Sequence, residues 1–371
     1  MSSHSNDNDG EEATMERNIE IMSNHSNDNE GEAEGIITRR QRLENFVLGE
    51  ETATSSSSLN AKNYFNVVFF ILNVVLTSGV GSAGWFGAAT PGDMSDKYAT
   101  IVTPKGTAFS IWSVIFLFQG IFSGYQLFPR VRAHPLVQDG VGYWYCGTCL
   151  FQSIWNFAFG YEQMALALVL IVLIWLTLVV IVYQQYVLVA KQYQQQQKSS
   201  KPTSLQFWLL RFPFSIHCGW LTAASLLNVN VLGVRLEASA STQLTIGIIS
   251  LAVLHAVSVW VVFGFAKPNY TIAGVLAWAN GWISAELKNP SALIISTFGG
   301  TDGIVIPAVQ AAAFCVSMII VAQVVVRLFL ILVIPSCAVN QTIVQNEDDD
   351  EKEEKVAKNK KSTDLENGSD K

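Results

Sequence analysis

Polar side chains occur in the middle of one long apolar stretch of this sequence, residues 205–233. His217, Asn228 and Asn230 lie within it. At ~1.5 Å per residue the stretch is long enough to cross a bilayer core of about 30 Å. Groups that form hydrogen bonds are costly at that depth unless a neighbouring helix, a cavity or a ligand meets them. We therefore predict an internal helix whose polar side faces whatever the helix bundle holds.

Indole rings are the second set of side chains that could bind a ligand. All ten tryptophans lie between positions 85 and 282. Those near the ends of apolar segments fit an aromatic belt at the membrane interface. Trp155, Trp175 and Trp220 lie near segment middles, where an indole either needs a partner for its N–H or lines a cavity for a flat apolar ligand.

Three further patterns could carry chemistry, and for each we favour a structural role. Cys146 and Cys149 have the spacing of a redox pair, but aromatic neighbours at the start of a membrane helix favour two buried, inert thiols. Glu286 lies below two tryptophans and could bind a cation or a proton, although a helix-end anchor at headgroup level is favoured. For His217 and His255, an interhelical hydrogen bond is favoured over a metal site or a proton relay.

These residues must be positioned by membrane helices. Half of the 371 residues are hydrophobic and only 14% are charged, whereas soluble domains carry ~25% charged residues. Eight apolar segments, each of about 18 residues or more, predict an all-α polytopic membrane helix bundle with about eight transmembrane helices. Their approximate bounds are 62–83, 105–128, 139–160, 163–190, 205–233, 242–266, 269–287 and 304–335. In the second segment, Gly120 and Gly124 share a face with Trp112 and Phe116, and we expect this face to serve helix packing.

Lys and Arg residues in the short loops predict the orientation of the bundle. They are more numerous on the side of the N-terminal tail, for example Arg130, Arg132 and Lys267, than on the opposite side. This bias and the even number of segments place both termini in the cytoplasm. The sequence leaves open which membrane holds the chain, an endomembrane or the mitochondrial outer membrane, and whether it forms a homodimer.

Motif residues in four of the segments resemble one known family. They are Pro104, Trp112 and Phe116 in the second segment, Gln152, Trp155, Asn156, Phe159 and Gly160 in the third, Trp175 in the fourth, and Trp220, Ala224, Leu227 and Asn228 in the fifth. The pattern is similar to that of the TspO/MBR tryptophan-rich sensory proteins, also called translocator or peripheral benzodiazepine receptor-like proteins. Two features depart from the family: a proline seven residues before Trp220 instead of four, and no sterol-associated motif after the fifth segment.

The resemblance implies a division of the chain into four parts. Residues 62–235 would form the five-helix bundle of the family, and residues 236–335 would add three transmembrane helices. Residues 1–61 and 336–371 are acidic and charged tails, respectively, whose polar composition cannot offset chain entropy, so we expect both to be disordered.

The resemblance also implies the function. Such proteins are not enzymes and bind a flat hydrophobic ligand, a porphyrin (tetrapyrrole) or a sterol, in a tryptophan-lined pocket inside the lipid bilayer, for transport or sensing. The residues assigned to this pocket are Trp112, Phe116, Trp155, Asn156, Trp175, Trp220 and Asn228. No cofactor, metal or catalytic residue is implied, and nucleic acid is not an expected partner of an acidic membrane chain. Two alternatives are a secondary transporter of a small solute or ion, with four helices on each side of a glutamine-rich linker, and a membrane redox enzyme using the two cysteines.

Overall fold

The computed structural model describes residues 59–195, 204–299 and 303–333, and these form helices and connecting turns without any strand. The predicted all-α class is confirmed. Apart from residues 59–61, the predicted tails 1–61 and 336–371 lie outside the described residues, as does most of the glutamine-rich linker.

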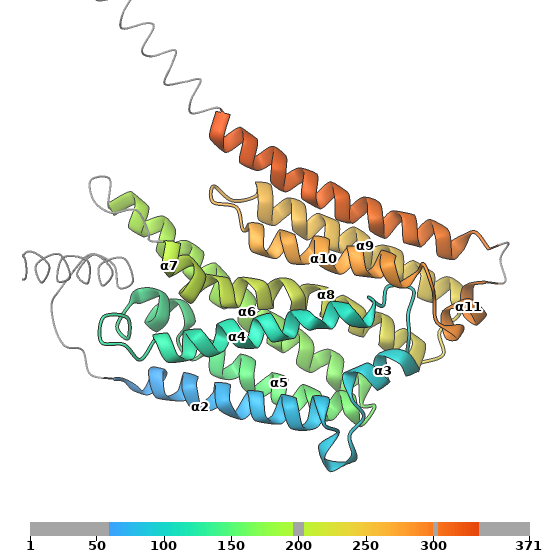
Figure 1. Ribbon diagram of the computed structural model, residues 1–371, viewed down its shortest axis with the longest axis horizontal. Helices are drawn as coiled ribbons and strands as arrows, with labels where there is room; N and C mark the ends of the chain where they lie inside the picture. The colour runs from blue at the N-terminus through green and yellow to red at the C-terminus, as the bar shows by residue number, and fades with distance from the viewer. Residues whose placement is uncertain (1–58, 196–203, 300–302, 334–371) are drawn as a thin grey trace, which may run out of the picture.

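Eight long helices run through the described part of the chain (Figure 1). They are α2 (Ala61–Leu76), α4 (Ile111–Tyr125), α5 (Trp144–Gly160), α6 (Met164–Gln195), α8 (Phe212–Arg235), α9 (Ala240–Phe263), α10 (Tyr270–Glu286) and a C-terminal helix, Val305–Val333. Three short helices connect them: α3 (Pro91–Lys97), α7 (Ser204–Gln206) and α11 (Ala292–Phe298). Single turns of π- or 3₁₀-helix occur at Thr77–Ser82, Trp85–Gly87, Gly106–Ser110, Leu136–Val141 and Phe207–Arg211.

Each predicted apolar segment overlaps one of the long helices, and the polytopic helical bundle is confirmed. Five helices are long and apolar enough to cross a membrane by length and composition alone: Ala61–Ser82, Gly106–Tyr125, Met164–Lys191, Ala240–Phe263 and Val305–Val333. The other three are α5, α8 and α10. Helices α5 and α10 have 17 residues each, and α8 is less apolar because it carries His217, Asn228 and Asn230. The beginning of α2 and the end of the C-terminal helix lie at the same end of the bundle (Figure 1).

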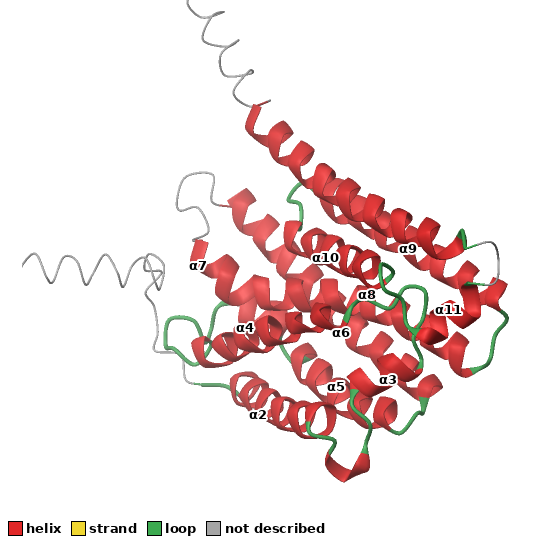
Figure 2. Ribbon diagram, turned by 45° about the vertical axis from the view of Figure 1, so that its right-hand side comes forward, coloured by secondary structure: helices red, strands yellow, loops and turns green. Residues whose placement is uncertain are grey.

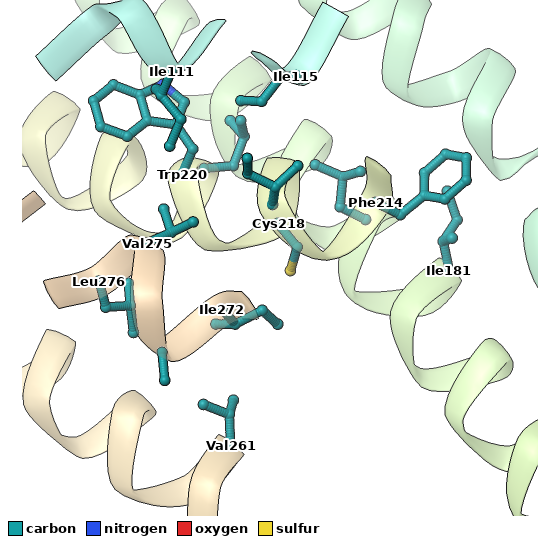
Figure 3. Close-up of a cluster of buried hydrophobic side chains, with 14 of the residues drawn as sticks. Ile111, Ile115, Ile181, Phe214, Cys218, Trp220, Val261, Ile272, Val275 and Leu276 are labelled. Atoms are coloured by element: carbon teal, nitrogen blue, oxygen red, sulfur yellow. The ribbon is translucent and has the colours of Figure 1, made fainter. Parts of the chain in front are cut away.

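Helix α8 is the central helix of the bundle. It packs against α4, α6, α9 and α10, so protein surrounds it on most sides (Figure 2). In Figure 3, Trp220 of α8 lies near Ile111 of α4 and Val275 of α10, whereas Phe214 of α8 lies beside Ile181 of α6. The structure thus agrees with the prediction that residues 205–233 form an internal helix.

Helix α2 turns its polar side inward and its apolar side outward. Its buried residues are Asn63, Asn66 and Asn73. The Asn66 amide donates to Oε1 of Gln126, and the Asn73 amide donates to Oε1 of Gln152, both at 3.3 Å. Exposed apolar side chains cover the opposite face: Tyr64, Phe65, Val68, Ile71, Leu72 and Val75. In a bilayer this arrangement gives lipid an apolar surface and joins helices by hydrogen bonds.

Three glycine positions differ in how closely a neighbouring helix approaches them. A Cβ added at Gly219 of α8 would lie 3.0 Å from Cβ of Val275 and 3.2 Å from Cα of Ile272, so α8 and α10 approach closely there. On α4, a Cβ at Gly120 would meet Phe70 of α2 at 3.3 Å, whereas one at Gly124 would meet nothing within 4 Å. Of the predicted glycine pair, only Gly120 therefore lies at a tight helix contact.

The three helices after α8 pack onto the first part of the chain. The indole N–H of Trp278 donates to the carbonyl oxygen of Ala108 at 3.3 Å, and the backbone N–H of Lys105 donates to the carbonyl oxygen of Trp282 at 3.1 Å. These bonds join α10 to the segment that leads into α4. One hydrophobic core therefore contains residues from both α4 and α10.

Candidate functional site

Three of the predicted site residues gather where α4 meets α8. Trp112 stacks on Phe116 with ring centroids 5.6 Å apart. The same indole makes edge contacts with His217 at 5.4 Å and with Trp220 at 6.4 Å. Phe109, in the turn before α4, contacts the ring of Trp220 edge-on, with ring centroids 5.6 Å apart. Residues at intervals of three and four on two facing helices thus form one aromatic cluster.

Trp155 and Asn228 form a second pair, between α5 and α8. The indole N–H of Trp155 donates to Oδ1 of Asn228 at 3.4 Å. The Asn228 amide donates to the carbonyl oxygen of Ala224 within α8. Trp155 also stacks on Phe159, with ring centroids 4.8 Å apart and planes 16° from parallel. The sequence motifs on the third and fifth segments therefore meet in space.

The remaining two predicted residues lie apart from these groups. Trp175 of α6 donates its N–H to the hydroxyl of Thr222 on α8 at 3.0 Å. Asn156 faces α2 instead of α8, and its amide donates to the Thr77 hydroxyl at 2.9 Å and to the Gln152 carbonyl oxygen at 3.0 Å.

The mid-segment indoles thus divide into two kinds. Trp155 and Trp175 have partners for their N–H groups. Trp220 is 2% exposed, and its Nε1 has no hydrogen-bond partner in the described part of the chain. From the sequence, an indole at this depth either has a hydrogen-bond partner for its N–H or lines a cavity for a ligand. Trp155 and Trp175 have such partners, whereas lining a cavity is the role open to Trp220.

A small cavity of about 20 Å³ adjoins Trp220. It is enclosed by α8, α9, α10 and the segment before α4. The lining residues are Val102, Pro104, Trp220, Ala223, Ala224, Leu226, Leu227, Ser250, Leu254, Ala279 and Ile283. A water molecule needs about 10–15 Å³ by the same measure, whereas drug-sized ligands occupy pockets of about 300–1,000 Å³. The cavity as it stands therefore accommodates one water-sized group.

The sequence matches one protein family over most of its length. The family model described as TSPO-like protein matches residues 63–326, from α2 into the C-terminal helix. The chain belongs to the TSPO-like protein family. No curated protein and no solved structure matches the chain significantly. The resemblance found in the first five segments is confirmed, and the match extends over most of the three additional helices.

The apolar helices and the family together make this TSPO-like protein an integral membrane protein. Its outward faces contact the lipid bilayer. The C-terminal helix is the most exposed of the spanning helices, with 6% of its most apolar window buried. It is held by the Ser317 hydroxyl, which donates to the Ala277 carbonyl oxygen, and by Gln323, which accepts from the Ser258 hydroxyl.

The two cysteines and His217, which the sequence offered as possible redox, metal or proton-relay residues of this TSPO-like chain, are buried. Cys146 and Cys149 are buried free thiols, and the Cys146 thiol donates to Oδ1 of Asn66 at 3.4 Å. His217 forms an interhelical hydrogen bond, as favoured from the sequence, to Gln119 of α4. Across the described ranges, no three potential metal ligands among His, Cys, Asp and Glu lie together.

Gln119 is a further member of the α4–α8 cluster, one that the sequence motifs did not indicate. Gln119 is fully buried and lies 2.8 Å from Nδ1 of His217. Its position seven residues after Trp112 places it on the same face of α4, and this periodicity could have identified it.

Proposed function

We propose that this TSPO-like protein binds a flat hydrophobic molecule, a porphyrin or a sterol, against the face of α8 that carries Trp220. The observation that supports this proposal is the cavity beside Trp220. Trp220, Ala224 and Leu227 are three of the four fifth-segment residues on which the family resemblance rests, and all three line it. The proposed role is binding, for transport or sensing, without catalysis.

Binding of such a molecule requires α8 to separate from α9 and α10. The cavity of about 20 Å³ is far smaller than a porphyrin, and its walls are α8 on one side and α9 and α10 on the other. Small side chains, Ala223 and Ala224 on α8 and Ala279 on α10, form part of these walls, so a small separation opens a slot between apolar surfaces. Trp112 and Trp155 contact α8 from α4 and α5, through an edge-on ring contact with Trp220 and a hydrogen bond to Asn228.

The test measures ligand binding by the full chain in detergent. Protoporphyrin IX and the fluorescent sterol dehydroergosterol are titrated separately, with quenching of, or energy transfer from, tryptophan as the signal. We expect binding of one of the two ligands, and a loss of at least tenfold in affinity with Trp155→Ala plus Trp220→Ala. The matched control is Trp208→Ala plus Trp260→Ala, which removes two exposed indoles. Equal binding by both double variants would contradict the proposal.

A further inference from the structure

We infer that the α4–α8 cluster contains a binding site for a neutral carbonyl oxygen, formed by the N–H groups of His217 and Trp220. The inference rests on the proposed function, because the oxygen belongs to the hydrophobic ligand. It adds the chemical class of that ligand: an uncharged, flat molecule that carries a ketone, quinone or similar carbonyl group.

A hydrogen bond to Gln119 determines which nitrogen of the His217 ring carries the proton. Nε2 of Gln119 lies 2.8 Å from Nδ1 of His217, and both side chains are fully buried. With the amide in this orientation, Nδ1 accepts the hydrogen bond, so the neutral ring carries its proton on Nε2. This Nε2–H has no hydrogen-bond acceptor among the described residues.

Trp220 supplies a second buried N–H donor on the same helix. Trp220 lies one turn after His217 on α8, and its Nε1–H is buried and also without an acceptor in the described ranges. Both rings meet the same indole, Trp112, at 5.4 and 6.4 Å. Buried donors are nearly always paired in proteins. His217 and Trp220 are three residues apart on α8, and a carbonyl oxygen has two lone pairs with which it accepts from two N–H groups.

The two helices that carry the cluster have uncharged side chains around the donors. Helix α4 has no charged residue from Ile111 to Tyr125, and α8 has no Asp, Glu, Lys or Arg between Arg211 and Arg235. A carboxylate bound here would be buried without a cation to neutralise it, which is strongly unfavourable. The site therefore favours a neutral acceptor over the carboxylates of a free porphyrin.

The cavity provides space next to one of the two donors, Trp220. Trp220 contributes both to the aromatic cluster and to the lining of the cavity of about 20 Å³. The rest of the lining is mostly apolar and suits a hydrocarbon skeleton. A ligand that separates α8 from α10 thus reaches the indole of Trp220 with a group the size of one oxygen atom.

Two other arrangements would satisfy these N–H groups. A single water molecule could accept from His217 and donate to Oε1 of Gln119, which also has no partner in the described part of the chain. Alternatively, the ring face of Trp112 could accept an N–H. Neither arrangement gives a preference for a carbonyl-bearing ligand, so ligand selectivity separates them from the inference.

The experiment compares three probes of nearly the same shape on the full chain in detergent. They are anthraquinone, anthracene without oxygen, and anthracene-9-carboxylate with a charge. With tryptophan quenching as the signal, we expect anthraquinone to bind roughly tenfold more tightly than anthracene, the ratio that one neutral hydrogen bond supplies. We expect the carboxylate to bind more weakly than anthracene.

Two variants and one control assign the selectivity. Trp220→Phe keeps an aromatic ring and removes the N–H, and His217→Phe does the same at the other donor. Each should lower the ratio of anthraquinone affinity to anthracene affinity toward one, because one of the two donors is lost. Trp260→Phe, at a 57% exposed indole, should keep the tenfold ratio.

A measurement on the unmodified chain covers the case in which a variant fails to fold. With ¹⁵N-labelled histidine, anthraquinone should shift the Nε2–H resonance of His217, and anthracene should not. Equal affinity for both probes, with no selective shift, would overturn the carbonyl site while leaving the proposed function intact. If none of the three probes binds, and neither protoporphyrin IX nor dehydroergosterol binds, both the carbonyl site and the proposed function are overturned.

Discussion

Trp175 and Thr222 join α6 to α8 by a hydrogen bond from the indole N–H to the hydroxyl oxygen, 3.0 Å long. The Thr222 hydroxyl in turn donates to the carbonyl oxygen of Cys218 at 2.9 Å. Thr222 is buried. Because no water competes for these groups within a bilayer, one hydroxyl positions an indole at the centre of the bundle.

Replacing Thr222 with valine tests this bond. The change preserves the shape of the side chain but leaves the Trp175 N–H without its acceptor, so we expect a loss of about 1 to 2 kcal/mol in the free energy of unfolding. Thermal unfolding in detergent measures it. Thr245→Val, at an exposed position whose hydroxyl bonds within its own helix, should change the melting temperature little. Equal effects of the two substitutions would contradict the assignment.

The polar side of α2 predicts that an apolar substitution there is destabilising, although the helix lies in a membrane. Asn73 donates to Gln152 and accepts from the hydroxyls of Thr77 and Ser153. Asn73→Leu would remove the donor to Oε1 of Gln152 and an acceptor of the two hydroxyls, at a cost of about 1–3 kcal/mol. The control is Ile71→Leu on the exposed side of the same helix. Unfolding curves that rank Asn73→Leu at or above wild-type stability would show that the bonds do not hold α2.

Close contact between α8 and α10 makes Gly219 sensitive to the addition of one methyl group. Gly219→Ala would force a Cβ to within 3.2 Å of the α10 backbone, and we expect a loss of about 1–3 kcal/mol from overpacking. Gly274→Ala on α10 is the matched control, since its Cβ would meet nothing within 4 Å. Thermal melting of the two variants side by side gives the comparison, and a tolerated Gly219→Ala would argue against this helix spacing.

The end of α3 is tied to the turn between α5 and α6 by an ion pair and a hydrogen bond. Glu162 contacts Nζ of Lys97 at 2.5 Å and accepts from the Tyr98 hydroxyl at 2.6 Å. The hydrogen bond from Lys97, followed by that from Tyr98, lowers the pKa of Glu162 from its ordinary value of 4.5. The hydrogen bond to Glu162 raises the pKa of Lys97.

A carboxylate with a lowered pKa contributes stability above its ordinary pKa and loses it as the pH falls through the lowered value. We therefore expect wild type to melt slightly above Glu162→Gln at neutral pH, with the difference vanishing in acid. The difference stays small because the pair is exposed. Melting temperatures of both proteins from neutral to acid pH measure it, and a constant difference would mean that Glu162 acts by something other than its charge.

Filling the cavity beside Trp220 should weaken ligand binding without removing any polar group. Ala279 is 1% exposed and lines the cavity. Ala279→Val places two further methyl groups in it, and we expect the affinity for the bound porphyrin or sterol to fall severalfold while the protein remains folded. Ala312→Val, on the exposed side of the C-terminal helix, is the control. Unchanged affinity in the Ala279 variant would place the ligand elsewhere.

The sequence alone determined the helices, the family and which side chains are unusual. Apolar segments of helical length and the motif spacings around Trp155 and Trp220 are local properties, so both the eight helices and the family resemblance were visible without coordinates. The internal position of α8 was also predictable, since His217, Asn228 and Asn230 need neighbours inside a membrane.

Only the tertiary structure decided which partner each of these side chains has. Trp155 and Trp175 belong to interhelical hydrogen bonds, Trp220 borders a cavity, and Asn156 faces α2, although the sequence grouped all four in one site. The reason is that hydropathy and periodicity define the polar face of a helix but not the helix opposite it. The rotation of α4 that brings Gln119 to His217 depends on packing between segments almost one hundred residues apart.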